Sequence, residues 1–485
     1  MNPPVPPAEG LFTSARFAAV MRELEPLAER FAAAGHRLFL VGGSVRDLVA
    51  SSQGFDVEGF DVESLDVEGF DLDATTTAHP PEIKRLLEGW ADAIWTQGER
   101  FGTIGAMKLV AGPGVASRTG EGEVLERVFE ITTHRAEAYR GDSRKPEVAF
   151  SDDIQADLSR RDFTVNAMAI DVTAAVPTLV DPFGGSADLV GRALRTPLTP
   201  VESFSDDPLR MLRAARFIAR YDLVPAPDLV HAARTMGERL AIVSAERIRG
   251  ELDKLLAAPA PLTGLQFVAD TGLVRHALPE VAALVERTIE MSVHPNGLAH
   301  AIAVASGVPV GDRTRRLTRW AALLALLGTE VAQGRMRHLR DSIAHIDGIG
   351  TLVAIHERLV AHPVGTMWAD REVRCMIGDA GDLLQEAIVM ARTTAEHLQP
   401  EARDRVTAGV SAFEDRMATL AANEDLGDLR PELDGASVME LLELTPGRQV
   451  GAALKFLTDL RLEIGPVGTD EATRRLLQWW AAQST

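Results

Sequence analysis

The pattern of hydrophobic and polar positions divides the chain into two parts. Up to about residue 195, short apolar runs of strand length alternate with segments of helical spacing. The predicted strands are residues 37–41, 70–73, 103–110, 124–133 and 165–172, and the predicted helices are 13–34 and 80–90. After about residue 200, helical spacing prevails to the C-terminus. Strands followed by helices predict an α+β fold, in which a head with a mixed β-sheet and helices precedes an all-helical remainder.

The first predicted strand leads into a feature suited to phosphate binding. The apolar run 38–41 ends at Gly42 and Gly43, and a helix start follows. A strand, a glycine pair and a helix N-terminus can form a phosphate cradle from backbone N–H groups. Further along, Asp71 and Asp73 are two residues apart, so in a strand both carboxylates point to the same face. Two carboxylates beside a phosphate cradle suit Mg²⁺ carried by a nucleotide, which predicts metal-dependent nucleotidyl transfer.

A tandem repeat of five residues separates the cradle from this acidic pair. The repeat supplies four acidic pairs in all, which are Asp56/Glu58, Asp61/Glu63, Asp66/Glu68 and Asp71/Asp73. By spacing alone, any of the four could be the metal-binding pair. A longer loop adds only about 0.6 kcal/mol to the cost of loop closure per doubling of its length, so the expansion is tolerable.

Length and composition narrow the class of protein. A chain of 485 residues with 46% hydrophobic and 25% charged residues is expected to form two to four domains. It has no apolar run of 18 residues and no signal-peptide pattern, and its single cysteine, Cys375, excludes internal disulfides, so we expect a cytoplasmic protein without a membrane span. The net charge of −20 argues weakly against a nucleic-acid partner, but eight acids lie within residues 56–73, so total charge does not decide the partner.

A basic pair near the end of the predicted head suits a triphosphate. Arg160 and Arg161 precede Asp162 and a short apolar stretch that contains Asn166. An arginine side chain donates two parallel N–H bonds to phosphate oxygens, and its charge is permanent. This basic pair is therefore a candidate to bind a triphosphate.

A second arginine pattern follows in a predicted helix. Asp207, Arg210, Arg213 and Arg216 recur every three residues, so on a helix they would lie along one stripe. A carboxylate next to arginines offers one acceptor and several fixed donors to the Watson–Crick edge of a base. Such a stripe could serve as a protein template that selects a nucleotide.

Several sequence blocks now point to a known family. The blocks LFLVGGSVRDLV, DLDATT, RRDFTVNAMA and DDPLRMLRAARF, in this order, resemble the class II CCA-adding tRNA nucleotidyltransferases and the related bacterial poly(A) polymerases. The stretches TTHRAEAYRGDSRKPEV, SAERIRGELDKLL and GRQVGAALKFLTDLRLEIGP resemble the actinobacterial CCA-adding enzymes. The implied domains are a disordered N-terminus at 1–12, a nucleotidyltransferase palm head at 13–195 with the repeat as an insertion loop at 51–70, a helical neck with the template helix at 196–285, a helical body at 286–370 and a helical tail at 371–485.

The resemblance implies an activity and a role for individual residues. It implies that C, C and A are added from CTP and ATP to the 3′ end of tRNA, whose acceptor arm the helical body and tail would hold. Asp71 and Asp73 match the family's Mg²⁺-binding pair, whereas the other three repeat copies are Asp-x-Glu. The remaining implied contacts are Gly43, Arg46 and Arg161 with the triphosphate, Asp207 and Arg210 with the base edge, and Arg213 and Arg216 with the rest of the nucleotide pocket.

The helical remainder departs from many relatives in one respect. Those relatives carry a metal phosphohydrolase domain of the HD type, which needs an adjacent His-Asp pair. None of the 12 histidines here is followed by Asp, and residues 321–330, where the pair is expected, contain no such ligands. We expect residues 286–370 to be a degenerate HD-like scaffold without hydrolase activity.

Three alternatives to CCA addition remain open from the sequence. A poly(A) polymerase, or an enzyme that adds only C or only A, would share the motifs of the head. A catalytically silent RNA-binding protein is the third alternative, and the intact Asp71/Asp73 pair and arginine stripe argue against it.

Overall fold

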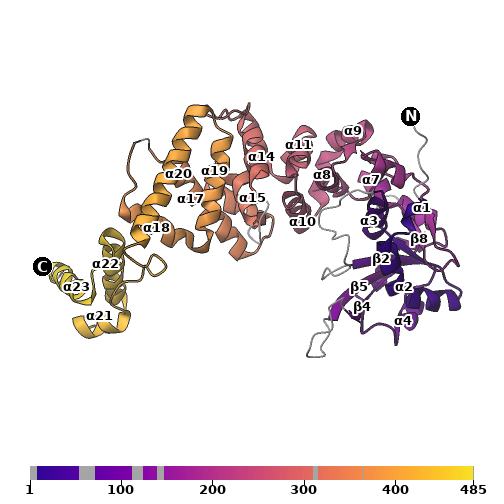
Figure 1. Ribbon diagram of the computed structural model, residues 1–485, viewed down its shortest axis with the longest axis horizontal. Helices are drawn as coiled ribbons and strands as arrows, with labels where there is room; N and C mark the ends of the chain where they lie inside the picture. Colours follow the sequence, from indigo (N-terminus) through magenta and orange to yellow (C-terminus); the bar gives the residue numbers. More distant parts are fainter. Residues whose placement is uncertain are drawn as a thin grey trace. The chain divides into compact units, whose positions relative to one another are not determined.

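The chain folds into two compact units, Met1–Val243 and Ser244–Thr485, each described here by itself. The structure is a computed structural model that describes residues 8–53, 71–111, 124–138, 147–309, 315–363 and 365–483. The repeat copies with Asp56/Glu58, Asp61/Glu63 and Asp66/Glu68 lie outside these residues. The first unit combines a β-sheet with helices and the second is helical, which confirms the predicted α+β class (Figure 1).

The first unit is built on a mixed sheet with the strand order β3-β4-β5-β2-β1-β8-β9. Strands β2 and β5 are parallel, and the other neighbouring pairs of this sheet are antiparallel. Its strands are β1 Leu38–Val41, β2 Asp71–Thr76, β3 Ala93–Trp95, β4 Thr103–Ala111, β5 Val124–Thr133, β8 Ala169–Asp171 and β9 Thr178–Val180. Two smaller sheets have two strands each. One pairs β6 Arg135–Ala138 with β7 Glu147–Phe150, and the other pairs β10 Ala193–Leu194 with β11 Val224–Pro225.

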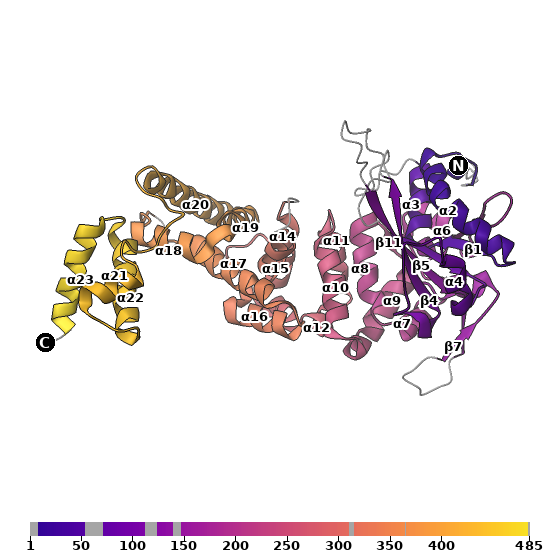
Figure 2. The same ribbon diagram turned by 90° about the horizontal axis from the view of Figure 1, so that it is seen from below.

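Helices cover one face of the sheet. On the second face, the described helices cover only the end formed by β1. On the first face, α4 lies against β4 and β5 (Figure 2). Just after α4, Trp90 packs edge-on against Phe129 of β5 with ring centroids 5.0 Å apart. On the second face, the β1 end is covered by a core cluster in which Leu158 and Ala167 pack on β1. The helices of this unit are α1 Ala8–Leu11, α2 Ala15–Ala33, α3 Gly43–Ser52, α4 Pro80–Leu87, α5 Ile154–Ser159, α6 Gly185–Val190, α7 Pro200–Asp206, α8 Arg210–Tyr221 and α9 Pro227–Met236.

Two elements differ from the sequence prediction. The predicted strand 165–172 is shorter, because Thr164–Asn166 forms a 3₁₀ turn and the strand comprises only Ala169–Asp171. The helix pattern over 202–221 is broken into α7 and α8. The break follows from Pro208, since a residue that precedes proline avoids the helical conformation, and Asp207 has φ −139° and ψ 100°. Asp207 therefore precedes α8 and does not lie on the helix with Arg210.

The second unit is entirely helical among its described residues. Its longer helices are α10 Ala245–Leu256, α11 Pro261–Asp270, α14 Gly297–Gly307, α15 Arg315–Leu324, α16 Thr329–His338, α17 Ile343–Ala361, α18 Asp370–Ala380, α19 Leu384–Glu396, α20 Pro400–Ala421, α21 Gly435–Leu442, α22 Arg448–Ile464 and α23 Thr469–Gln483, and its short ones are α12 Val274–Ala277 and α13 Pro279–Ala282. In the described part of the chain, every helix is too short or too polar to cross a membrane.

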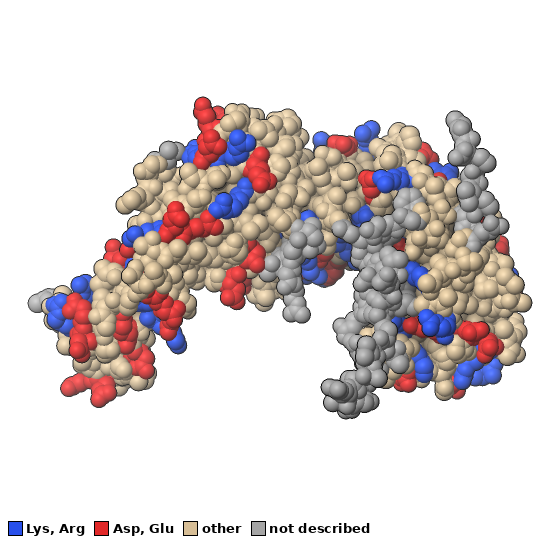
Figure 3. Space-filling model, viewed as in Figure 1, with Lys and Arg blue, Asp and Glu red and all other residues tan. Residues whose placement is uncertain are grey.

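Charged side chains of opposite sign alternate on the helical unit. On the face drawn in Figure 3, basic and acidic side chains lie next to one another over these helices. Opposite charges also pair inside this unit, where the Glu424 carboxylate accepts from Arg374 at 2.8 Å and from Arg461 at 2.9 Å, with all three side chains buried. The net charge of the chain therefore does not describe the local charge of the folded surface.

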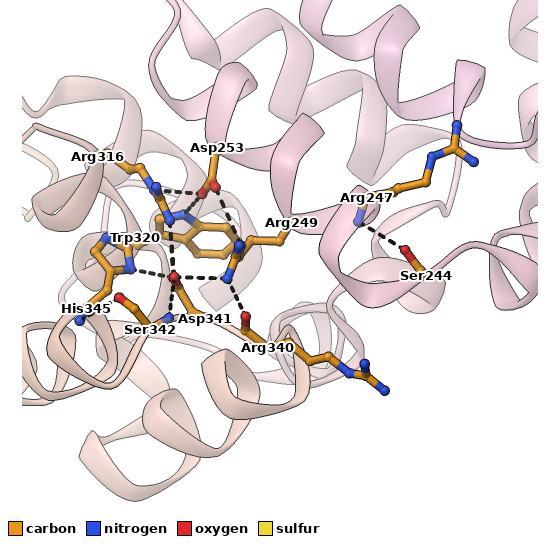
Figure 4. Close-up of polar contacts among 10 residues, drawn as sticks. All are labelled: Ser244, Arg247, Arg249, Asp253, Arg316, Trp320, Arg340, Asp341, Ser342 and His345. Carbon is orange, nitrogen blue, oxygen red and sulfur yellow. Dashed lines mark hydrogen bonds and ion pairs between the residues drawn. The ribbon is translucent and has the colours of Figure 1, made fainter. Parts of the chain in front are cut away.

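A network of charged side chains joins α10 to α15 and to the start of α17 (Figure 4). At its centre, the buried Asp341 carboxylate accepts from Arg249 at 3.0 Å, from Arg316 at 3.3 Å and from the Nδ1 of His345. The neighbouring Asp253 forms an ion pair with Arg316, with its Oδ1 2.9 Å from the Arg316 Nε. Although burial favours the neutral form of Asp341, the Ser342 N–H and the surrounding cations lower its pKa. The network therefore holds an ionised carboxylate between three helices.

Removing this carboxylate is expected to destabilise the second unit. Asp341→Ala removes one of the two carboxylates that Arg249 and Arg316 share and leaves them only Asp253. Breaking a fully buried pair typically costs about 3–5 kcal/mol. Because both arginines are partly exposed, we expect a loss of about 2–3 kcal/mol in the free energy of unfolding, measured by urea denaturation. The matched control is Asp347→Ala on the exposed side of α17, with an expected change below about 0.5 kcal/mol. Equal midpoints for the two variants would contradict this role of Asp341.

Histidines from two helices and two flanking segments gather in the second unit. The Nε2 of His294 and the Nδ1 of His397 lie 3.1 Å apart. The buried His300 bonds Ser292 at 2.9 Å, and the buried His356 bonds Thr394 at 2.8 Å. Burial lowers the pKa of His300 to about 4, with further lowering by His294 and His397. Burial also lowers the pKa of His356 to about 4.

This cluster predicts a loss of stability in mild acid. In the unfolded chain these histidines titrate near pH 6.5, whereas His300 and His356 stay neutral in the folded protein down to about pH 4. Above pH 6.5, the free energy of unfolding should not depend on these two histidines. From pH 6.5 towards pH 4, it should fall by about 1.4 kcal/mol per pH unit for each histidine. Urea denaturation at pH 7 and pH 5 measures this slope. His356→Gln should reduce the difference between the two pH values, and an unchanged difference would contradict the assignment.

Candidate active site

A pocket of about 240 Å³ lies on the second face of the head sheet. Its lining comprises Val41, Asp73, Ala74, Thr75, Glu130, Thr132, Arg135, Asp157, Arg160 and Arg161. Asp73 of β2 and Glu130 of β5 are register partners, so their side chains stand next to each other on the same face. Three arginines line the same pocket. The pocket thus combines a pair of neighbouring carboxylates with a set of cations.

Gly42, the first residue of the glycine pair, lies next to two residues that line this pocket. Gly42 follows β1 with φ +72° and ψ −135°, a conformation that glycine adopts readily and other residues rarely do. A Cβ atom at Gly42 would lie 3.0 Å from the Arg161 Nη1 and 3.5 Å from the Asp73 Oδ2. Gly42 therefore leaves a small space between a guanidinium and a carboxylate, at the point where α3 begins with Gly43. No side chain caps the N-terminus of α3.

Arg46 lies in the first turn of α3 and is 7% exposed. Its guanidinium donates to both oxygens of Asp47, at 2.8 and 3.0 Å, and its Nη1 donates to the Asn166 Oδ1 at 2.8 Å. The group also lies over the ring of Tyr221, 4.3 Å from the centroid. These contacts tie α3 to the 3₁₀ turn and to the end of α8.

Asp162 joins this group of residues to α8. Its Oδ1 accepts from the Asn166 side chain at 2.9 Å and from the Phe163 N–H at 2.8 Å, and its Oδ2 lies 2.6 Å from the Arg213 Nη2. Burial alone would raise the pKa of Asp162, but Arg213 and these two donors hold it below its usual value. Asp162 is therefore ionised at neutral pH and fixes Arg213.

The remaining residues of the predicted template lie at the start of α8 and one turn further. Arg210 donates to Ser203 Oγ at 2.9 Å and to the carbonyl of Arg160. The Asp207 Oδ1 accepts from the Leu209 N–H at 3.1 Å, which places this carboxylate in the short turn before α8. Arg216 packs over the ring of Phe217, 4.8 Å from its centroid. Arg210 and Arg213 are thereby held to the segment that also carries Arg161.

Comparison with known proteins reveals the relationships of this chain. The family model described as "Poly A polymerase head domain" matches residues 38–195, and the model described as "Probable RNA and SrmB- binding site of polymerase A" matches residues 223–284. The CCA-adding enzyme of Streptococcus gordonii is 30% identical over 337 residues, which cover 69% of this chain and 71% of that protein. The chain belongs to the CCA-adding enzyme family.

Other members of the CCA-adding enzyme family agree with this assignment. The CCA-adding enzyme of Bacillus velezensis is 32% identical over 304 residues, and this match covers 62% of this chain and 63% of that protein, slightly less than two thirds of its length. The crystal structure of the Bacillus stearothermophilus CCA-adding enzyme in complex with CTP matches with a TM-score of 0.65 at 23% identity, and it covers 97% of this chain and 99% of that chain. At this level of identity, the structural match demonstrates a shared fold.

The donor set of the pocket suits a hard divalent cation. Asp73 and Glu130 offer carboxylate oxygens, the ligands that Mg²⁺ prefers, and Asp71 occupies the same strand two residues before Asp73. The side chain of Asp71 lies outside the described residues. Among the side chains that the structure does describe, no three His, Cys, Asp or Glu residues converge as a ready metal site. The residues present fit a Mg²⁺ site that Asp71 would complete.

Sequence reasoning missed three charged residues of this pocket, which are Glu130, Arg135 and Asp157, and the last of these pairs with Arg161 at 3.6 Å. Glu130 lies in the predicted strand 124–133. Its position next to Asp73 depends on the register between β2 and β5, which the sequence pattern does not give. Arg135 begins β6 and donates to Thr103 at 2.8 Å. The one available signal was that Arg135 falls within the block TTHRAEAYRGDSRKPEV, which had been singled out for its resemblance to other enzymes.

Proposed function

We propose that this chain is a CCA-adding tRNA nucleotidyltransferase, which adds C, C and A to the 3′ end of tRNA from CTP and ATP. The observation that carries the proposal is the convergence of Asp73, Glu130 and Arg161 beside the Gly42 cradle. Carboxylates for a metal ion and an arginine for phosphate are what nucleotidyl transfer requires. The family assignment adds that relatives of matching sequence are CCA-adding enzymes.

In the proposed reaction, the head holds the triphosphate and orients its α-phosphate. Arg161 binds phosphate oxygens, and the backbone of Gly43 at the start of α3 offers N–H groups to the same anion. Asp71 and Asp73 would hold Mg²⁺, with Glu130 next to them. When bound, the ion lowers the pKa of the attacking hydroxyl and neutralises charge on the leaving pyrophosphate. The tRNA 3′-hydroxyl oxygen forms a bond to the α-phosphorus, and the bond to pyrophosphate breaks.

We assign the choice of nucleotide to the turn before α8 and to the first residues of α8. Asp207 supplies an acceptor, and Arg210 supplies donors whose position is set by Ser203 and by the Arg160 carbonyl. Arg213, fixed by Asp162, and Arg216 would complete the nucleotide pocket. A fixed set of donors and acceptors distinguishes bases because a mismatch leaves polar groups unpaired.

For Arg46, the contacts support a role one step removed from the triphosphate. A guanidinium that is 7% exposed and bonds Asp47 and Asn166 has its donors largely engaged. We infer that Arg46 positions α3 and the Asp162 segment relative to each other, and that the predicted contact with phosphate would require these bonds to rearrange.

We propose that the helical unit serves the tRNA acceptor arm and carries out no hydrolysis. His300 and His356 bond Ser292 and Thr394, and no histidine of the sequence is followed by Asp, which supports a degenerate HD-like body. The resemblance of the sequence blocks suggests the actinobacterial type. Structured RNA is recognised chiefly by shape and phosphate contacts, for which paired helices offer rigid surfaces. The lone Cys375 agrees with a cytoplasmic setting.

The second candidate is a poly(A) polymerase, because the family model of the head bears that description. Supplying the nucleotides separately distinguishes the candidates. For tRNA without its CCA end, we expect CTP alone to add two residues and ATP alone to add none, whereas tRNA ending in CC should receive one A. Long extension with ATP alone would favour the poly(A) polymerase. Binding of tRNA without any incorporation would indicate a non-catalytic RNA-binding protein.

A further inference from the structure

We propose that Trp95 is a stacking platform for the last bases of the RNA acceptor strand, a role that rests on the proposed nucleotidyl transfer. Trp95 ends β3, the edge strand of the head sheet, and is 36% exposed. It lies outside the pocket formed around Asp73. Its place in the sheet nevertheless connects it to that pocket.

A single row of register partners runs from Trp95 to the candidate metal ligands. Trp95 pairs with Gly105 of β4, Gly105 pairs with Glu130 of β5, and Glu130 pairs with Asp73 of β2. Residues paired in this way point to the same face of a sheet. Trp95 therefore shares the face of the sheet that carries Asp73 and Glu130.

The absence of a side chain at Gly105 determines where the indole lies. A Cβ atom at Gly105 would lie 2.0 Å from the Trp95 Nε1, so the ring occupies the space above this glycine. Neighbouring strands are about 4.8 Å apart, and Gly105 is two strands from Asp73. The indole thus lies about one strand spacing, about 5 Å, from the Glu130 position and about 10 Å from the Asp73 position, within reach of the one or two nucleotides that precede a reacting 3′-hydroxyl.

Along β4, the residues that follow Gly105 on this face are apolar. Met107 and Leu109 follow Gly105 along β4 with the same alternation, and Leu109 is 44% exposed. By contrast, the β1 end of this face is covered by the cluster of Leu158 and Ala167. The β3–β4 end is therefore the accessible side of the sheet next to the candidate metal ligands.

The direction of the reaction identifies the occupant. In phosphoryl transfer, the attacking and leaving oxygens lie roughly in line on opposite sides of the phosphorus atom. The phosphate-binding Arg161 approaches Asp73 from Gly42 at the β1 end, and Arg210 is bonded to Arg160 there. If the triphosphate occupies the β1 end, the attacking RNA strand must approach from the β3–β4 end, over Trp95. Aromatic side chains hold single-stranded bases irrespective of sequence, as a tRNA-processing enzyme requires.

The test measures how the kinetic constants for RNA and nucleotide respond to changes at Trp95. Loss of one stacked base costs about 10- to 100-fold in affinity, so Trp95→Ala should raise the KM for tRNA ending in CC by that factor. The KM for ATP should not change. Trp95→Phe should retain most of the wild-type value, whereas Trp95→Leu, which keeps apolar bulk without a ring, should resemble alanine. The Phe and Leu variants decide the question if the alanine variant does not fold.

Ile94→Ala provides the matched control, because Ile94 is in the same strand and is also 36% exposed but points to the other face. A second readout uses an RNA hairpin with 2-aminopurine in its last 3′ position. Stacking on the indole should quench its fluorescence in the wild type and in Ile94→Ala, but not in Trp95→Leu.

The outcomes distinguish the proposed nucleotidyl transfer from the proposed role of Trp95. A wild-type protein that incorporates no nucleotide overturns the proposed function itself. The role of Trp95 alone is overturned if the wild type is active and the Trp95→Leu variant has the same KM for tRNA and the same fluorescence quenching as Ile94→Ala. A raised KM for ATP with an unchanged KM for tRNA would assign Trp95 to the incoming nucleotide and would also overturn the proposal.

Discussion

Replacing Asp73 with alanine is expected to abolish nucleotide incorporation. Asp73 lines the pocket beside Glu130 and faces Arg161 across the Gly42 space. A metal ion held by carboxylates supplies several kcal/mol of stabilisation to the transition state, so loss of one ligand should lower kcat by about 10³-fold or more. We expect the same result for Asp71→Ala. Steady-state incorporation of labelled CTP into tRNA without its CCA end measures the effect.

Asp61→Ala is the control for this prediction, because Asp61 belongs to an acidic pair of the repeat that the family resemblance ranks below Asp71/Asp73. It should retain near wild-type kcat. Affinity for tRNA, measured by filter binding, should change little in all three variants, since the carboxylates act on phosphate and not on the acceptor arm. An active Asp73→Ala together with an inactive Asp61→Ala would show that the wrong pair had been chosen.

Changing Asp207 or Arg210 is expected to blur the choice between C and A. A well-placed pair of hydrogen bonds to a base edge discriminates by about 1–3 kcal/mol, so Asp207→Ala should reduce the preference for the correct nucleotide by about 5- to 150-fold. The ratio of kcat/KM for CTP and ATP, measured at each position of the added end, reports this preference.

Arg220→Ala offers a comparison from the same helix, because Arg220 lies on α8 but is exposed and outside the proposed template. Its nucleotide preference should equal that of the wild type. If Asp207→Ala lowered kcat for both nucleotides equally and left their ratio unchanged, Asp207 would have no part in selection.

Local patterns in the sequence predicted the elements that local chemistry determines. Strand β1 and the glycine pair followed from an apolar run that stops at two glycines, and the shared face of Asp71 and Asp73 followed from strand alternation. The break before α8 could also have been predicted, since Pro208 disfavours a helical Asp207. The prediction instead followed the spacing of three residues between the arginines, which favours one continuous helix.

Contacts between distant segments could not be predicted in the same way. Glu130 reaches Asp73 only through the register of two parallel strands, which no spacing in the sequence encodes. The contact of Arg46 with phosphate stays a prediction, and its bond to Asn166, 120 positions further along the chain, could not be derived from spacing. The shortened strand β8 has the same cause, because Asn166 bonds Asp162 and Arg46 in place of sheet partners. Tertiary contacts decided all three features.

The most direct test of the account is the sequence of the tail that the protein adds to tRNA. Purified protein is incubated with tRNA that lacks its CCA end, with CTP and ATP together, and the 3′ ends of the products are sequenced. The account predicts that the added sequence is C, C, A and that extension then stops. A tail of A alone, or tRNA that remains unextended, would contradict it.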